Sequence, residues 1–196
     1  MHVTKVASDL SDPGAAGWSG VGTEAVGLAP IPIDAQPTEY VRTKWSGLDY
    51  GNVSEATVAA AHDGPTAWVR LEWADSEQPN VEFPDCAAVY FSPDAASPAA
   101  TIGDDGSTVD LWFWRSDEDT GRHLSGNGPG VFRPLEGAVA ASAALVDGRW
   151  AVVLGRPVGE IEGGAHMGVA VWDGSNEERA GIGSATTAWL PVSVES

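Results

Sequence analysis

The chain has 196 residues, of which 43% are hydrophobic, and its 28 acidic and 10 basic side chains give a formal net charge of −18. This length and apolar content predict one domain with a hydrophobic core. The charge excludes nucleic acid as a partner, because few cations are available to neutralise phosphates. Lys5 and Lys44 are the only lysines. Such a surface indicates a halophilic protein whose self-repulsion is screened by molar salt, with an ordinary acidic protein as the alternative.

Cysteine content and hydropathy limit the compartment. Cys86 is the only cysteine, which excludes an intrachain disulfide and a cysteine-rich metal site. It opens an apolar run and is expected to be a buried core thiol. No apolar stretch is long enough to span a membrane, and residues 1–20 lack the layout of a signal peptide. We therefore expect the chain in the cytoplasm, or exported as a passenger of a partner that carries the signal.

The first part of the chain differs from the rest. Residues 1–38 are rich in Gly, Pro, Ala and Asp and predict an extended N-terminal arm, which leaves residues 39–196 as the folded domain. Trp18 indicates that part of the arm packs, either on this domain or as an anchor on a neighbouring subunit.

Short apolar runs separated by glycine-rich turns predict strands after residue 38, and helical periodicity is scarce. The expected strands cover residues 40–45, 56–61, 67–73, 86–91, 109–115, 139–145, 149–154, 166–173 and 186–194, with a long loop over residues 116–136. Alternation places Trp112 and Trp114 on one strand face and Phe113 on the other. Together these runs predict an all-β fold, an antiparallel β-sandwich of about eight to ten strands with long loops and little helix.

The sequence lacks a recognisable catalytic constellation. No metal-binding helix motif, nucleophile elbow or phosphate loop occurs, so we expect no catalytic residues, no metal ion and no enzymatic activity of the chain's own. The carboxylates are scattered over turns, as in a solvated acidic surface. The nine tryptophans could line a pocket for a flat ligand such as a haem or a sugar, or could fill a core or a subunit interface.

Three segments in order carry a family resemblance. They are Val109-Asp110-Leu111-Trp112-Phe113-Trp114-Arg115, the stretch from Asp147-Gly148-Arg149-Trp150 to Arg156-Pro157, and Val169-Ala170-Val171-Trp172-Asp173-Gly174 followed by Glu178-Arg179. Their order and spacing resemble those of the haem b-binding subunits related to ethylbenzene dehydrogenase gamma. The resemblance covers about residues 40–192.

The resemblance implies a gamma-like, non-catalytic subunit of a molybdenum enzyme of the dimethyl sulfoxide reductase family, a group that includes nitrate, chlorate and selenate reductases. Such a subunit is a β-sandwich that holds one b-type haem between a methionine and a lysine. It passes electrons between an iron–sulfur subunit and an external carrier. The implied partners are the iron–sulfur and molybdopterin subunits of the same complex. The implied location is the outer face of the cell membrane, with the chain exported as a passenger of a partner subunit, and the cytoplasm is the alternative.

The chain departs from this family at both haem-ligand positions. Ile102 or Thr101 stands where the resemblance places the methionine, and Gly183 stands where it places the lysine. Neither an isoleucine nor a glycine side chain can ligate iron. Either other residues have taken over ligation, or the domain has kept the fold and lost the haem.

Few side chains could replace the lost ligands. The axial candidates are Met167, His166 and His123, and only one of the adjacent pair His166 and Met167 could reach an iron, because neighbouring strand residues point to opposite faces. The candidates for the pocket wall are Trp112, Trp114, Trp172 and Arg179.

These observations leave two functions open. The first is an accessory subunit of a halophilic molybdenum oxidoreductase, for example a nitrate reductase, which transfers electrons if haem is retained and is otherwise structural. The alternative is a stand-alone β-sandwich module that binds a ligand such as a carbohydrate.

Overall fold

The structure is a computed structural model and describes residues 1–75, 82–161 and 165–195. Its strands are β1 (His2–Lys5), β2 (Thr23–Pro30), β3 (Glu55–His62), β4 (Thr66–Ala74), β5 (Cys86–Ser92), β6 (Val109–Arg115), β7 (Arg122–Gly126), β8 (Phe132–Pro134), β9 (Ala140–Val146), β10 (Arg149–Pro157), β11 (His166–Trp172), β12 (Ser184–Thr186), β13 (Leu190–Pro191) and β14 (Ser193–Val194). The helices are α1 (Glu39–Trp45) and the 3-10 turns η1 (Ala16–Gly20), η2 (Ile33–Ala35), η3 (Ala99–Thr101), η4 (Val158–Glu160) and η5 (Gly174–Asn176).

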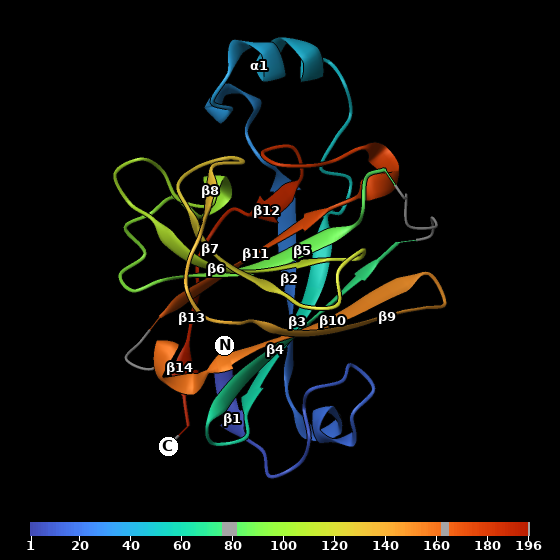
Figure 1. The fold of residues 1–196 in the computed structure, drawn as a ribbon, viewed down its shortest axis with the longest axis vertical. Coiled ribbons are helices and arrows are strands. Elements are labelled where there is room, and N and C mark those ends of the chain that lie inside the picture. Colours follow the sequence, from blue (N-terminus) through green and yellow to red (C-terminus); the bar gives the residue numbers. More distant parts are fainter. Residues whose placement is uncertain (76–81, 162–164, 196) are drawn as a thin grey trace.

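Strand β2 joins two arms of one hydrogen-bonded sheet (Figure 1). Its residues 23–27 pair with β3, which continues to β4, β10 and β9, whereas its residues 28–30 pair with β12, which continues to β11, β5, β6, β7 and β8. All of these pairs are antiparallel, and β1 adds parallel pairs with β3 and β14. The predicted all-β, largely antiparallel fold is therefore confirmed.

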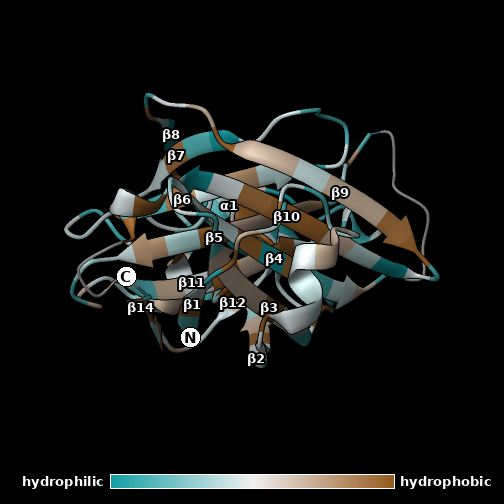
Figure 2. Ribbon diagram, turned by 90° about the horizontal axis from the view of Figure 1, so that it is seen from below, coloured by the Kyte–Doolittle hydropathy of each residue, from teal (hydrophilic) through white to brown (hydrophobic). Residues whose placement is uncertain are grey.

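The two arms face each other across a central core. This inner cluster combines Val58, Leu71 and Leu154 from one arm with Val89 and Trp112 from the other. A second cluster, here called the outer cluster, covers the opposite face of β5, β6 and β11; it contains Cys86, Tyr90, Ile102, Val109, Leu111, Leu124 and Trp172. Strands such as β6 and β10 carry both hydrophilic and hydrophobic residues in Figure 2, as expected for strands with alternating side chains.

The structure has fourteen strands in its described residues, more than the eight to ten expected. The difference arises mainly from short strands. The expected loop over residues 116–136 contains β7 and β8, which extend the sheet from the edge of β6. Leu124 is the only large apolar residue of β7, so this run shows little hydrophobic periodicity and the sequence does not predict a strand. The strand forms because the run pairs with the edge of β6.

Residues 1–38 differ from the expected extended arm. They contribute β1 and β2, and β2 lies between the two arms of the sheet. Trp18 is only 8% exposed and packs with Leu10, Trp68 and Val153 of the same chain, and its indole N–H donates to the carbonyl of Leu10. Strands on both sides of the expected boundary between residues 38 and 39 therefore belong to one sheet. Trp18 packs against residues of its own chain.

Residues 40–45, expected as a strand, lie in helix α1. The Thr38 side chain accepts a hydrogen bond from the backbone N–H of Val41 and caps the helix. Glu39 in the first turn and Lys44 in the last turn complement the helix dipole. α1 projects from one end of the sheet (top of Figure 1). Among the described residues, no helix has the length and hydrophobicity that a membrane span requires.

His62 at the end of β3 provides a stability test. It is 4% exposed, and neither ring nitrogen has a hydrogen-bond partner. An unsatisfied buried polar group destabilises a fold, so we expect His62→Leu to raise the free energy of unfolding by about 1 kcal/mol. Urea unfolding measures this change, and His2→Leu at an exposed site is the control. A loss of stability in His62→Leu would contradict the prediction.

Candidate functional site

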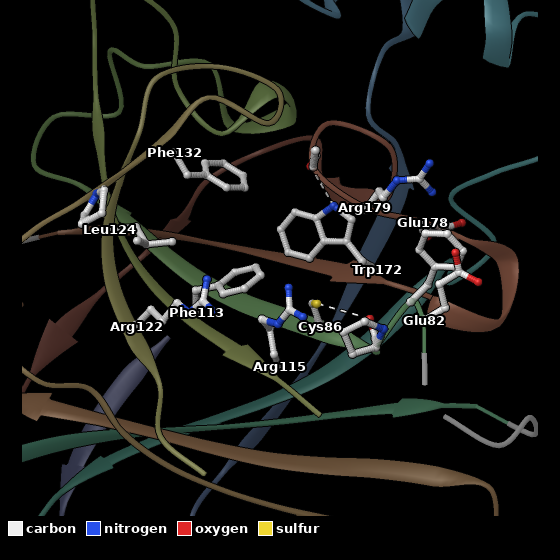
Figure 3. Close-up of a pocket in the computed structure, with 14 residues that line it drawn as sticks. Glu82, Cys86, Phe113, Arg115, Arg122, Leu124, Phe132, Trp172, Glu178 and Arg179 are labelled. Carbon is white, nitrogen blue, oxygen red and sulfur yellow. Dashed lines mark hydrogen bonds between the residues drawn. The ribbon is translucent and has the colours of Figure 1, made fainter. Parts of the chain in front are cut away.

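A cavity of about 400 Å³ lies on the outer face of β5, β6 and β11 (Figure 3). Strand alternation places Cys86, Phe113 and Trp172 on this face. Phe132 of β8 completes an aromatic wall, in which the ring centroids of Phe113 and Phe132 lie 5.5 and 6.1 Å from that of Trp172. The indole N–H of Trp172 donates to the carbonyl of Ala180 at 2.9 Å, which fixes the ring.

Three arginines surround this wall. Arg115 donates two hydrogen bonds of 2.9 Å to the Asp117 carboxylate, and these bonds lower the pKa of Asp117. Arg122 is paired with Glu118. Arg179 lies with its guanidinium 4.5 Å from the centroid of the Phe83 ring. The cavity thus combines an apolar wall with a rim of three arginines, of which Arg115 and Arg122 are paired with carboxylates.

Cys86 forms part of the cavity wall and is buried, as expected. Burial raises the pKa of its thiol to about 12. The thiol donates to the Pro84 carbonyl at 3.4 Å. The side chain is therefore a protonated packing group, and its sulfur is a poor ligand for a metal ion.

Glu178 supports the cavity from below and is 1% exposed. Its carboxylate accepts hydrogen bonds from the backbone N–H groups of Gly51 at 2.6 Å and Asp173 at 3.0 Å. Burial is the main reason why the pKa of this carboxyl is raised. The sequence does not indicate that Glu178 is buried and hydrogen-bonded. One of its partners, Gly51, is 127 residues away in the chain, and no local pattern links the two.

Glu178 should make stability depend on pH. Since the folded state has the raised pKa, it holds the proton at pH values where the unfolded chain has released it, so stability falls as pH rises through that window. We expect Glu178→Gln, which cannot titrate, to show a smaller fall in unfolding free energy as the pH rises above the ordinary glutamate pKa of 4.5. Urea unfolding at constant salt measures it, with exposed Glu55→Gln as the control for lost charge. Parallel pH curves for wild type and Glu178→Gln would contradict this.

The structure separates the four pocket-wall candidates. Trp172 and Arg179 line the cavity. Trp112 and Trp114 belong to the inner cluster on the other face of β6, where Trp112 lies 4.7 Å from Phe91 between ring centroids. Because Trp112 and Trp114 are two residues apart in β6, they share the inner face of the sheet, whereas Trp172 lies on the outer face.

The three axial candidates lie apart from the cavity. Met167 is 1% exposed and packs in the inner cluster. His123 pairs with Trp112 across β6 and β7, and its ring nitrogens contact the carboxylate of Asp110 at 2.7 Å and the carbonyl of Glu136 at 2.5 Å.

His166 shares the outer face of β11 with Trp172 but stands at the opposite end of this strand. The two are six residue steps apart along the strand, which corresponds to roughly 20 Å. None of the three candidates is among the residues that line the cavity.

The two family ligand positions both belong to packed parts of the outer cluster. Ile102 is 0% exposed and adopts left-handed backbone geometry with a φ of 57°. A Cβ atom built on Gly183 would lie 2.5 Å from Cδ1 of Trp172. Trp172 therefore occupies the space that a side chain at residue 183 would need.

The residues present do not fit a b-type haem held in the manner of the resembled family. Such a haem needs side-chain donors such as His, Met or Lys on its iron, and the described residues lining the cavity include none of these. The cavity offers aromatic contacts and arginines, and its one potential sulfur ligand, Cys86, is a thiol whose pKa is raised to about 12.

In two clusters of side chains, the possible metal-ligand atoms lie within 4.8 Å of one another. The first cluster is Asp110, His123 and Glu160, and the second is Asp75, Asp85 and Asp173. Protein donors already hold most of these atoms. Arg156 binds Glu160 at 2.5 Å, and Asp85 accepts from the Gly174 N–H at 2.8 Å and from the Trp150 indole at 3.2 Å.

Comparison with curated proteins bears on the resemblance. The chain is 38% identical over 98 residues to the gamma subunit of chlorate reductase from Ideonella dechloratans, a match of 45% of this chain and 41% of that protein. It is 33% identical over 96 residues to a Haloferax mediterranei protein named as a candidate haem subunit (ORF7) of respiratory nitrate reductase, covering 44% and 34%. The resemblance to gamma-type reductase subunits is confirmed. The chain matches less than half the length of both relatives, and no family model matches it.

Solved structures support the fold. A family 9 carbohydrate-binding module from Caldicellulosiruptor kristjanssonii, in complex with glucose, aligns over 100% of this chain and 95% of that one with a TM-score of 0.53 and 9% identity. A carbohydrate-binding protein candidate from Bacteroides uniformis aligns over 100% and 98% with a TM-score of 0.54 and 14% identity. At this identity the likeness concerns the fold alone.

Proposed function

We propose that the chain is a non-catalytic, gamma-like accessory subunit of a molybdenum oxidoreductase complex, and that its role is structural. The observation that carries the proposal is the sequence similarity to two proteins named as reductase subunits. The packing at residues 102 and 183 supports the structural branch, because Ile102 is fully buried and Trp172 fills the space beside Gly183. Its partners are the iron–sulfur and molybdopterin subunits, and export as a passenger of one of them stays a prediction.

A stand-alone sugar-binding module is less well supported. Sugar-binding sites commonly present the open face of an aromatic ring for stacking. In the cavity, Trp172 is 1% exposed and is covered by Phe113 and Phe132. The likeness to carbohydrate-binding modules is one of fold, which does not by itself imply a shared ligand.

The test is assembly combined with absorption spectroscopy. The tagged chain is expressed with the molybdopterin and iron–sulfur subunits of a reductase from the same genome, and the complex is purified and measured oxidised and dithionite-reduced. We expect stoichiometric co-purification and no b-type Soret and α bands that depend on this chain. Failure to co-purify would overturn the accessory-subunit proposal.

The spectrum distinguishes the structural role from electron transfer. If b-type bands are present and vanish when Met167, His166 or His123 is changed to alanine, that residue is an iron ligand and the structural role is wrong. A complex prepared without this chain provides the baseline, because haem on another subunit would remain in it.

A further inference from the structure

A groove of about 200 Å³ lies beneath α1 and adjoins the cavity described above, since Arg179 and Ala180 line both. One side of the groove is formed by α1, with Tyr40 and Lys44, and the other side by the segments around Gly130 and Arg179. The cavity and the groove together are here called the Arg179 cleft. Its walls come from segments far apart in the sequence, and α1, the projecting element in Figure 1, forms one end.

Basic side chains gather in the Arg179 cleft, which the carboxyl groups of Glu82 and Glu178 also line. Lys44, Arg115, Arg122 and Arg179 line it, which is four of the 10 basic residues in a chain of net charge −18. Arg115 and Arg122 are paired with acidic side chains. Among the salt bridges of the described residues, none includes Lys44 or Arg179. Within the described residues, these two cations therefore have no carboxylate partner in a salt bridge, and Arg179 donates instead to the backbone carbonyl of Glu177 at 2.7 Å.

Apolar side chains stand beside these cations. Tyr40 on α1 is 72% exposed, and the rings of Phe113 and Phe132 are half-buried in the cavity wall. Aromatic residues together with arginine are the residue types enriched at the energetic centres of protein interfaces. The cleft therefore combines an apolar surface with two cations that form no salt bridge within the described residues.

We propose that the Arg179 cleft is the docking site for an acidic segment of a partner subunit that carries an aromatic or aliphatic side chain. Carboxylates of the segment pair with Lys44 and Arg179, and its apolar side chain packs beside Phe113 and Phe132. Charge complementarity at short range selects this occupant, because its carboxylates would pair with Lys44 and Arg179, which form no salt bridge within the described residues. The inference rests on the proposed function, which supplies the partner.

The test compares two charge-reversal pairs in the co-expressed complex. Lys44→Glu with Arg179→Glu removes the unmatched cations of the cleft. Lys5→Glu with Arg149→Glu makes the same change in charge at exposed sites outside it. We expect the first pair to weaken assembly at least about tenfold and the second to leave it within about twofold, with unchanged thermal unfolding of both free chains. Tyr40→Ser should also weaken assembly, whereas Val146→Ser, which removes another exposed apolar side chain, should not.

A photo-crosslinking residue at position 40 identifies the occupant. Crosslinks to an acidic partner segment that contains an apolar side chain support the proposal, and crosslinks to a second copy of this chain or to a basic segment overturn it. If wild type assembles and the cleft pair assembles equally well, the docking site is wrong while the proposed function stands. If wild type does not assemble with the reductase subunits, the proposed function fails and this inference fails with it.

Discussion

Raising potassium chloride from about 0.1 M to about 2 M should stabilise the folded chain by at least about 3 kcal/mol, which corresponds to a rise of roughly 6–12 °C in the unfolding temperature for a domain of this size. The cause is the net charge of −18, which is confined to a smaller volume in the folded state than in the unfolded state. Salt shortens the screening length from about 10 Å at 0.1 M to a few ångströms at molar concentration, so the repulsion that opposes folding is largely removed.

Thermal and urea unfolding over a salt series measure this effect. Sucrose at matched osmolality is the control, because it favours compact states without screening charge. Sodium chloride should act as potassium chloride does, since screening depends on ionic strength. An unfolding midpoint that stays flat or falls with salt would contradict the halophilic interpretation of the sequence.

The sequence predicted those parts of the fold in which a strand buries one face. In β4 the residues 67, 69, 71 and 73 face the inner cluster, as alternation indicates. The run from Val109 to Arg115 matches β6 residue for residue. Both hairpins carry an Asp-Gly pair, and His62-Asp63-Gly64-Pro65 and Val146-Asp147-Gly148 connect neighbouring strands of the structure. These features depend on local sequence patterns, namely the alternation of apolar residues and the Asp-Gly turns.

Other parts depend on contacts that no local pattern encodes. Helix α1 begins at the Thr38 cap. The sequence predicted a strand there, because the aromatic and β-branched residues of this run favour strands. β2 has the Gly and Pro content of a loop and is a strand because two separate edges pair with it. The cavity could be predicted only in part. Phe113 follows from alternation. Phe132 lies in β8, which forms by pairing with β7, and Glu178 lies in the loop after η5, so tertiary packing places both side chains.

The structure also shows that residues 102 and 183, the two family ligand positions, differ in whether they can accommodate the ligand side chain of the family. A methionine at residue 102 would be close in volume to the isoleucine present, and an unbranched side chain is less strained at a φ of 57° than a β-branched one. We therefore expect Ile102→Met to change the unfolding free energy by less than about 1.5 kcal/mol. Residue 183 has no such freedom, because any side chain there begins with a Cβ atom against the Trp172 indole.

Gly183→Ala should accordingly destabilise the chain by about 3 kcal/mol or more. The added Cβ would lie 2.5 Å from Cδ1 and 2.7 Å from Nε1 of Trp172. That indole is 1% exposed, is packed against Phe113 and Phe132, and is held by its hydrogen bond to Ala180. Gly27→Ala is the matched control, since no atom lies within 4 Å of a Cβ at that position in β2, and it should be neutral or slightly stabilising.

A double-mutant cycle with Trp172→Ala identifies the clash as the cause. Trp172→Ala alone should cost about 3–5 kcal/mol through the cavity that it opens. Because removing the indole makes room for the new Cβ, the double variant should be more stable than the sum of the two single effects by about 2 kcal/mol. Urea unfolding of the four proteins gives the coupling. Additive effects would mean that Trp172 does not exclude a side chain at residue 183, and the packing argument against a lysine ligand at this position would then fail.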